Sequence, residues 1–174
     1  MAVIDIRKLN RALRISCKIL ACHPGSDYGL GSLKEKRQLK TRLLIAVVDD
    51  DERMCVAMRR LLRSVRLDVE TFTSGAAFLE SLKSHQPDCV VIDIHMPGMD
   101  GFEVQTRLME AGIHLPIVIV TGDDSAESRE RALANGASVY LSKPMDGQTL
   151  LDAITTAIAH PPDSSPPHAE DQPG

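Results

Sequence analysis

A short apolar run that leads directly into one aspartate and a turn-rich loop constrains this chain more than any other feature. Residues 89–92 (Cys-Val-Val-Ile) are uninterruptedly apolar, and they lie between Pro87 and the pair Pro97-Gly98. A half-exposed strand would alternate apolar and polar side chains, so this run predicts a fully buried parallel strand. Asp93 follows it directly. An ionised aspartate there would lie at the carboxyl edge of the sheet, where open α/β folds place their ligands.

Taken alone, Asp93 would more often be a turn or cap residue. Three further apolar runs, however, also end in polar groups. The other runs cover residues 43–48, 117–120 and 139–142. The groups at their ends are the acidic run Asp49, Asp50, Asp51 and Glu52, the pair Thr121-Gly122 and the pair Lys143-Pro144. One edge of one sheet would therefore gather carboxylates, a hydroxyl and an ammonium group.

In this order and spacing the residues resemble the receiver domains of two-component response regulators, over residues 43 to about 159. Asp93 resembles the phospho-accepting aspartate, and the loop Met96-Pro97-Gly98-Met99-Asp100-Gly101 follows it. The further matches are the acidic pair Asp49 and Asp50 that helps to hold Mg²⁺, the switch hydroxyl Thr121, the switch aromatic Tyr140, and Lys143, the lysine that contacts the phosphoryl group.

The resemblance implies a Mg²⁺ site formed by the carboxylates of Asp49, Asp50 and Asp93 and by the backbone carbonyl of His95. Crowded carboxylates repel, by about 4 kcal/mol for two unit charges ~4 Å apart at an effective dielectric of about 20, and a bound cation removes that cost. Hard oxygen ligands favour Mg²⁺. Asp51 lengthens the acidic run, so a register shifted by one residue stays open. The distance from the preceding apolar run favours Asp49 and Asp50.

The same resemblance assigns roles around the acceptor. Asp93 would attack a phosphoryl group as a carboxylate nucleophile, while Lys143 neutralises the oxygens of the transferring group. The side chains of His95 and Asp123, two residues after the acceptor and two after Thr121, would flank the route of attacking water and influence the phosphoryl lifetime. Asp123 could orient water or repel it, so the direction of its effect is open.

The fold class follows from an alternation of strand and helix that repeats five times. Short strands are expected at 43–48, 68–72, 89–92, 117–120 and 139–142, and helices at about 52–65, from Ser74, at about 101–111, at about 125–134 and around 150–158. This α/β pattern predicts a doubly wound parallel sheet with helices on both faces. The resemblance implies the flavodoxin-like, five-stranded order 2-1-3-4-5. The helix at 125–134 has little apolar surface and should be loosely held.

Charge and composition divide the chain into three parts. Residues 1–42 carry ten Lys and Arg against three Asp and Glu. We expect a basic N-terminal extension at 1–41 (an amphipathic helix and a linker), a receiver domain at 42–160, and a disordered Pro/Ser-rich tail at 161–174. The four cysteines show no disulfide or metal spacing, which fits a reducing cytoplasm. No apolar run approaches the roughly 20 residues that cross a bilayer, so no membrane insertion is expected.

These features predict a stand-alone receiver that accepts a phosphoryl group on Asp93 from a histidine kinase or histidine phosphotransfer protein. It would signal by altered binding to a downstream protein target. A phosphorylation-dependent dimer is compatible with this prediction. The receiver itself is not expected to bind DNA directly. It would not be an enzyme beyond catalysing its own phosphorylation and dephosphorylation. A phosphorylation-independent interaction module is the alternative, although neither the acceptor nor Lys143 is missing. A haloacid-dehalogenase-like phosphatase would need a second aspartate where this chain has His95.

Overall fold

The computed structural model describes residues 42–161, which form an α/β domain. Its strands are β1 (Leu44–Val48), β2 (Asp68–Phe72), β3 (Cys89–Ile92), β4 (Ile117–Thr121) and β5 (Val139–Ser142). Its helices are α2 (Glu52–Ser64), α3 (Gly75–Ser81), α4 (Gly101–Glu110), α5 (Ala126–Ala134) and α6 (Gly147–Ala159). The extension expected at 1–41 and, apart from residue 161, the tail expected at 161–174 lie outside the described residues.

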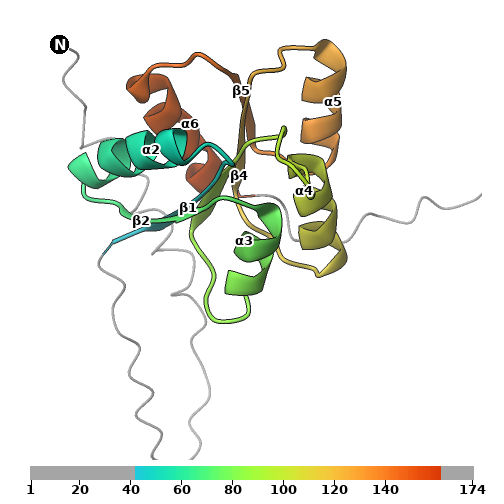
Figure 1. Ribbon diagram of the computed structural model, residues 1–174, viewed down its shortest axis with the longest axis horizontal. Helices are drawn as coiled ribbons and strands as arrows, with labels where there is room; N and C mark the ends of the chain where they lie inside the picture. The colour runs from blue at the N-terminus through green and yellow to red at the C-terminus, as the bar shows by residue number, and fades with distance from the viewer. Residues whose placement is uncertain (1–41, 162–174) are drawn as a thin grey trace, which may run out of the picture.

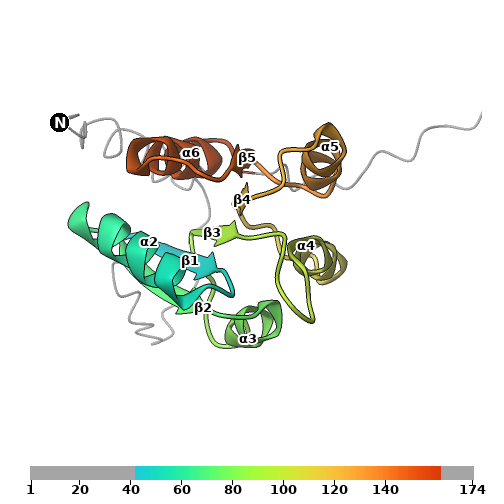
Figure 2. The same cartoon turned by 45° about the horizontal axis from the view of Figure 1, so that its top comes forward.

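All neighbouring strands run parallel, and the sheet has the order β2-β1-β3-β4-β5. The predicted fold class and strand order are therefore confirmed. Helices α2 and α6 cover one face of the sheet, and α3, α4 and α5 cover the other (Figures 1 and 2). None of the helices in this part of the chain is long and apolar enough to cross a membrane.

The sheet divides the hydrophobic core into two layers because alternate strand residues point to opposite faces. On β3, Cys89 and Val91 pack with the α2–α6 layer, whereas Val90 and Ile92 pack with the α3–α5 layer. All residues of β3 are buried, as the uninterrupted apolar run predicted. Tyr140 of β5 belongs to the α3–α5 layer.

Every described helix begins with a side chain that accepts a hydrogen bond from a first-turn N–H group, which stabilises the helix start. The capping residues are Asp51, Ser74, Asp100, Ser125 and Asp146. The cap predicted at Ser74 is confirmed. Asp51 caps α2 by accepting from the Arg53 N–H at 2.8 Å. This structural role is separate from that of the two aspartates before it.

Gly101 brings the start of α4 against the backbone that follows β3. A Cβ atom added there would lie 2.5 Å from the carbonyl oxygen of Asp93 and 2.9 Å from the Cα of Ile94. The Gly101 N–H donates to the Ile94 carbonyl at 2.9 Å. Since both obstacles are main-chain atoms, a side chain could be accommodated only by moving the acceptor loop. Gly101 therefore fixes the loop that carries His95.

Candidate functional site

Three carboxylates meet at the carboxyl edge of the sheet. Asp49 follows β1 and Asp93 follows β3, and these strands are neighbours. With Asp50 they offer carboxylate oxygens that all lie within 4.8 Å of one another. Asp49 and Asp93 are 2% and 8% exposed, whereas Asp50 faces solvent. Among the aspartates of the acidic run, the structure thus brings Asp49 and Asp50 to Asp93, and it places Asp51 at the start of α2.

Lys143 reaches this cluster from the end of β5. Its Nζ lies 2.8 Å from Asp49 Oδ2 and 2.7 Å from Asp93 Oδ2. Burial alone would lower the pKa of Lys143, but the bonds to the two carboxylates outweigh it and raise that pKa. Burial raises the pKa of Asp49, despite the contact with Lys143. One ammonium group therefore forms ion pairs with two largely desolvated carboxylates.

Main-chain N–H groups hold the other oxygen of each buried carboxylate. The Asp51 N–H donates to Asp49 Oδ1 at 2.9 Å, and the His95 N–H donates to Asp93 Oδ1 at 3.2 Å. These bonds and the ammonium group fix the orientation of Asp49 and Asp93 before any ligand arrives. The His95 side chain is exposed at this edge.

The cluster fits a hard divalent cation. Three carboxylates around one ammonium leave an excess negative charge of two if all are ionised. Carboxylate oxygens are the ligands that Mg²⁺ prefers, and Mg²⁺ commonly takes one or two of them besides water. The residues that could hold it are Asp49, Asp50 and Asp93. A divalent cation would neutralise this excess charge, whereas one further ammonium group would neutralise only half of it.

Thr121 ends β4 and is completely buried. Its Oγ1 accepts a hydrogen bond from the Asp123 N–H at 3.2 Å. The hydroxyl keeps its own proton for another acceptor, since accepting this bond uses a lone pair. Thr121 is thus linked to the β4–α5 loop and able to donate elsewhere.

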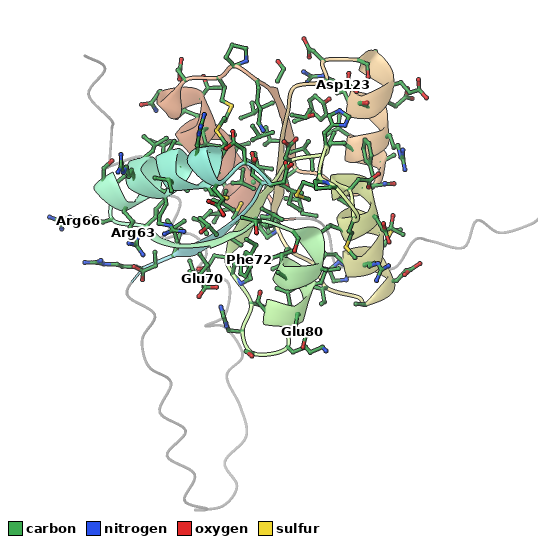
Figure 3. All side chains as sticks on the ribbon, in the orientation of Figure 1. Arg63, Arg66, Glu70, Phe72, Glu80 and Asp123 are labelled. Atoms are coloured by element: carbon green, nitrogen blue, oxygen red, sulfur yellow. The ribbon has the colours of Figure 1, made fainter. Side chains whose placement is uncertain are left out.

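Asp123 lies beside the N-terminal end of α5 (Figure 3). Its carboxylate accepts from the N–H and hydroxyl of Ser125 at 2.9 and 3.1 Å and from the hydroxyl of Ser128. The Ser128 hydroxyl, the Ser125 bonds and, more weakly, the charge of His95 lower the pKa of Asp123. The side chain expected near the route of water therefore also secures the first turn of α5. The spacing Asp-x-Ser-x-x-Ser, a local capping pattern, could have predicted this.

Tyr140 completes this linkage from β5. Its hydroxyl donates to the main-chain carbonyl of Asp123 at 2.5 Å, and the Arg129 guanidinium lies 4.8 Å from the ring centroid. The side chain is 4% exposed, so Tyr140 is a buried aromatic residue of β5. The sequence identified Thr121, Asp123 and Tyr140 separately, and it did not predict that Asp123 is bonded to both of the others.

Comparison with known proteins agrees with this geometry. Residues 45–155 match the family described as the response regulator receiver domain. Nodulation protein W of Bradyrhizobium diazoefficiens is 38% identical over 120 residues, which cover 69% of this chain and 53% of that protein. Transcriptional regulatory protein TdiR of Thauera aromatica is 37% identical over 115 residues, covering 66% of this chain and 51% of that protein.

Solved structures show the same fold. A response regulator receiver protein from Burkholderia phymatum is 43% identical with a TM-score of 0.61, and the match covers 67% of this chain and 95% of that one. The chain spans about half the length of the curated relatives it matches. From the family match over residues 45–155 and the sheet order, we conclude that this chain belongs to the response regulator receiver domain family.

Proposed function

We propose that this chain accepts a phosphoryl group on Asp93 from a histidine kinase or histidine phosphotransfer protein and signals by altered binding to a downstream protein. The proposal is supported above all by the buried Asp93 carboxylate, which Lys143 contacts at 2.7 Å beside Asp49 and Asp50. The receiver itself would not bind DNA. We expect the chemistry of the chain to be confined to its own phosphorylation and dephosphorylation, which fits a receiver domain family.

Asp49, Asp50 and Asp93 would hold Mg²⁺, with the His95 backbone carbonyl as a further ligand. When bound, Mg²⁺ would neutralise charge on the phosphoryl oxygens and on the carboxylates that surround them. Its binding would require Lys143 to share Asp49 and Asp93 with the metal. The ammonium group is well placed for this, since it is part-exposed on a flexible side chain.

In the transfer step, one carboxylate oxygen of Asp93 forms a bond to phosphorus while the bond from phosphorus to the donor atom breaks. The donor group leaves with the bonding electron pair, and a histidine donor that carries a proton on its other ring nitrogen leaves as neutral imidazole. Lys143 faces the oxygens on which negative charge accumulates, which stabilises the transition state electrostatically. The fixed orientation of Asp93 reduces the entropy lost on reaching the reactive geometry.

The added group would act on Thr121. A phosphoryl group brings about -1.5 to -2 charges and strong acceptor oxygens, and the Thr121 hydroxyl can donate to one of them. A movement of Thr121 would disturb its bond with the Asp123 N–H and, through Asp123, the bond made by Tyr140. The surface made by α5, β5 and α6 would change as a result. His95 and Asp123 would set how fast water removes the phosphoryl group.

The test is transfer to the full chain from acetyl phosphate, followed by mass spectrometry of peptides. We expect label on Asp93 in the presence of Mg²⁺ and little without it. Asp93→Asn should abolish the label and keep the fold. Asp100→Asn is the matched control, because it changes a nearby aspartate whose capping role asparagine can retain. Undiminished label in Asp93→Asn would refute the assignment.

A further inference from the structure

Helix α5 is held to the domain by contacts at its ends more than by apolar burial. Among its nine residues Ala132 is buried, whereas Leu133 is 47% exposed. Burying one alanine methyl group contributes little hydrophobic stabilisation. The contacts that fix the position of this helix must therefore be polar contacts and contacts with aromatic rings.

The C-terminal end of α5 is bound by α4, beside which it lies in Figure 1. Gln105 is 1% exposed, and its Nε2 donates to the carbonyl oxygens of Ala132 and Asn135 at 3.0 and 3.3 Å. Carbonyls at the end of a helix lack some of the partners that those of the interior have. One turn earlier on α4, the ring centroid of Phe102 lies 4.0 Å from the Arg131 guanidinium carbon, in a cation–π contact. Both contacts join the last turn of α5 to the first half of α4.

The Gln105 amide has one favourable orientation. If it were turned over, its oxygen would face the two carbonyl oxygens that its nitrogen now contacts. In the favourable orientation Oε1 is buried, and no hydrogen-bond partner for it exists within residues 42–161. An unpaired buried acceptor is costly, and methionine would fill a similar volume without that cost. The two bonds donated by Nε2 therefore explain why position 105 is occupied by glutamine and not by an apolar residue of similar volume.

The N-terminal end of α5 is bound to a different part of the domain. Asp123 accepts from Ser125 and Ser128 on the helix side. On the sheet side, its N–H donates to Thr121 of β4 and its carbonyl accepts from Tyr140 of β5. One end of the helix is thus tied to the two strands that carry the switch residues, and the other end to α4.

We propose that Gln105 is a positioning residue that makes the C-terminal end of α5 a pivot, so that phosphorylation of Asp93 displaces the N-terminal end of this helix. The inference rests on the proposed function. A movement of Thr121 reaches Asp123 and the first turn of α5 directly. The bonds from Gln105 to the last turn involve neither Thr121 nor Tyr140, so they stay in place while the first turn moves.

Amide exchange in the full chain tests the anchor before any phosphorylation. Gln105→Met removes both donors at similar volume, so the amides of 135–137, which close the end of α5, should exchange about tenfold faster or more. The amides of β4 should keep their protection. Gln148→Met, which removes an exposed amide bonded to Asp152 of α6, is the matched control and should change neither set. Unchanged exchange at 135–137 in Gln105→Met would overturn the proposal.

A second pair of variants covers the case in which Gln105→Met does not fold. Arg131→Gln removes an exposed side chain from the Phe102 ring and should speed exchange at 135–137 severalfold. Arg129→Gln removes the matching contact with Tyr140 and should leave 135–137 unchanged. Equal effects of the two variants on 135–137 would count against an anchor at that end.

The pivot itself is tested with beryllofluoride, a phosphoryl mimic, by amide chemical shifts. In the wild type, changes are expected over 123–129 and at Tyr140, with little change at 135–137. In Gln105→Met, which should still accept label on Asp93, the changes should extend to 135–137. Wild-type changes as large at 135–137 as at 123–129 would overturn the pivot. Absence of label on wild-type Asp93 would refute the proposed function, and the exchange of the unmodified protein would still decide whether Gln105 anchors α5.

Discussion

The ammonium group of Lys143 lies 2.7 Å from the Asp93 carboxylate, and this contact joins the ends of two strands that are separated by β4 in the sheet. The same Nζ contacts Asp49 at 2.8 Å. Lys143 therefore compensates two buried carboxylates in the absence of a metal ion, in addition to the catalytic role proposed for it.

The first prediction concerns stability without metal. Lys143→Met should lower the free energy of unfolding by about 1–2 kcal/mol, less than the ~3–5 kcal/mol of a fully buried pair because the ammonium is part-exposed. Added Mg²⁺ should restore much of the loss. Lys83→Met, which removes an exposed pair with Glu80, is the control and should change stability by about 0–1 kcal/mol. Denaturant unfolding with and without Mg²⁺ measures the free energy of unfolding of both variants. Equal losses in the two variants would contradict the buried-pair interpretation.

The second prediction separates the three consecutive aspartates. Asp50→Asn should weaken Mg²⁺ binding about tenfold, because it removes a charged ligand from the cluster. Asp51→Asn should bind Mg²⁺ nearly as the wild type does, because asparagine can still cap α2. Calorimetric titration measures both affinities. If Asp51→Asn proved to be the weaker binder, the register of the metal site would be shifted by one residue.

The third prediction concerns the coupling through Thr121. Thr121→Ala should still take up label on Asp93 but should lose most of the phosphorylation-dependent change in amide exchange over residues 122–146. The reason is that alanine lacks the hydroxyl, which is the only group of the Thr121 side chain that can donate to a phosphoryl oxygen. Thr121→Ser keeps a hydroxyl and should retain most of the change. A full response in the alanine variant would show that another group carries the coupling.

The fourth prediction is a dependence of stability on pH. The pKa of Asp146 is lowered because its carboxylate accepts bonds from Thr149 at the start of α6. A carboxyl whose pKa is lower in the folded state stabilises that state above its unfolded pKa of about 3.9, and this stabilisation is lost as the pH falls through the folded value.

Asp146→Asn keeps a cap without a titrating group, so the drop of melting temperature below about pH 4 should be shallower than in the wild type. Asp146→Ala should melt at a lower temperature already at neutral pH. Thermal melts between neutral and acid pH measure the difference. An acid drop as steep in Asp146→Asn as in the wild type would exclude this contribution.

The fifth prediction concerns the glycine behind the acceptor loop. Gly101→Ala should destabilise the domain by about 1–3 kcal/mol and slow the labelling of Asp93, because its Cβ would meet the backbone of Asp93 and Ile94. Gly122→Ala is the control, since no atom lies within 4 Å of the Cβ added there. Denaturant unfolding and the rate of labelling should show that Gly101→Ala is less stable than Gly122→Ala and is labelled more slowly. A tolerated alanine at 101 would show that the loop can shift freely.

The strands and helices could be predicted from the sequence because their determinants are local, whereas the strand order was implied by the resemblance to receiver domains. The uninterrupted apolar run of β3 is buried as expected, and the helix starts carry recognisable caps. The site could be placed for the same reason: Asp49, Asp93 and Lys143 each directly follow a strand, and parallel strands bring such positions to one edge.

Contacts between side chains from distant elements could not be predicted in this way. The local sequence gives no sign of the bonds made by Gln105, because its two acceptors lie 27 and 30 residues further along the chain. The weak apolar surface of α5 was recognised, and its single buried residue agrees with that. The sequence did not reveal the polar contacts that hold the helix instead, because these depend on how α4, α5 and β5 pack together.

The division of the core into two layers limits which partners could sense phosphorylation. Tyr140 lies with the α3–α5 layer, on the opposite face of the sheet from the layer of α2 and α6. A partner that bound only α2 would contact the same surface before and after a movement of Tyr140, so its affinity would be equal for both states. Ligands of equal affinity shift no equilibrium, however tightly they bind. Such a partner could remain bound throughout the phosphorylation cycle, whereas a partner that discriminates between the two states must touch the surface made by α5, β5 and α6.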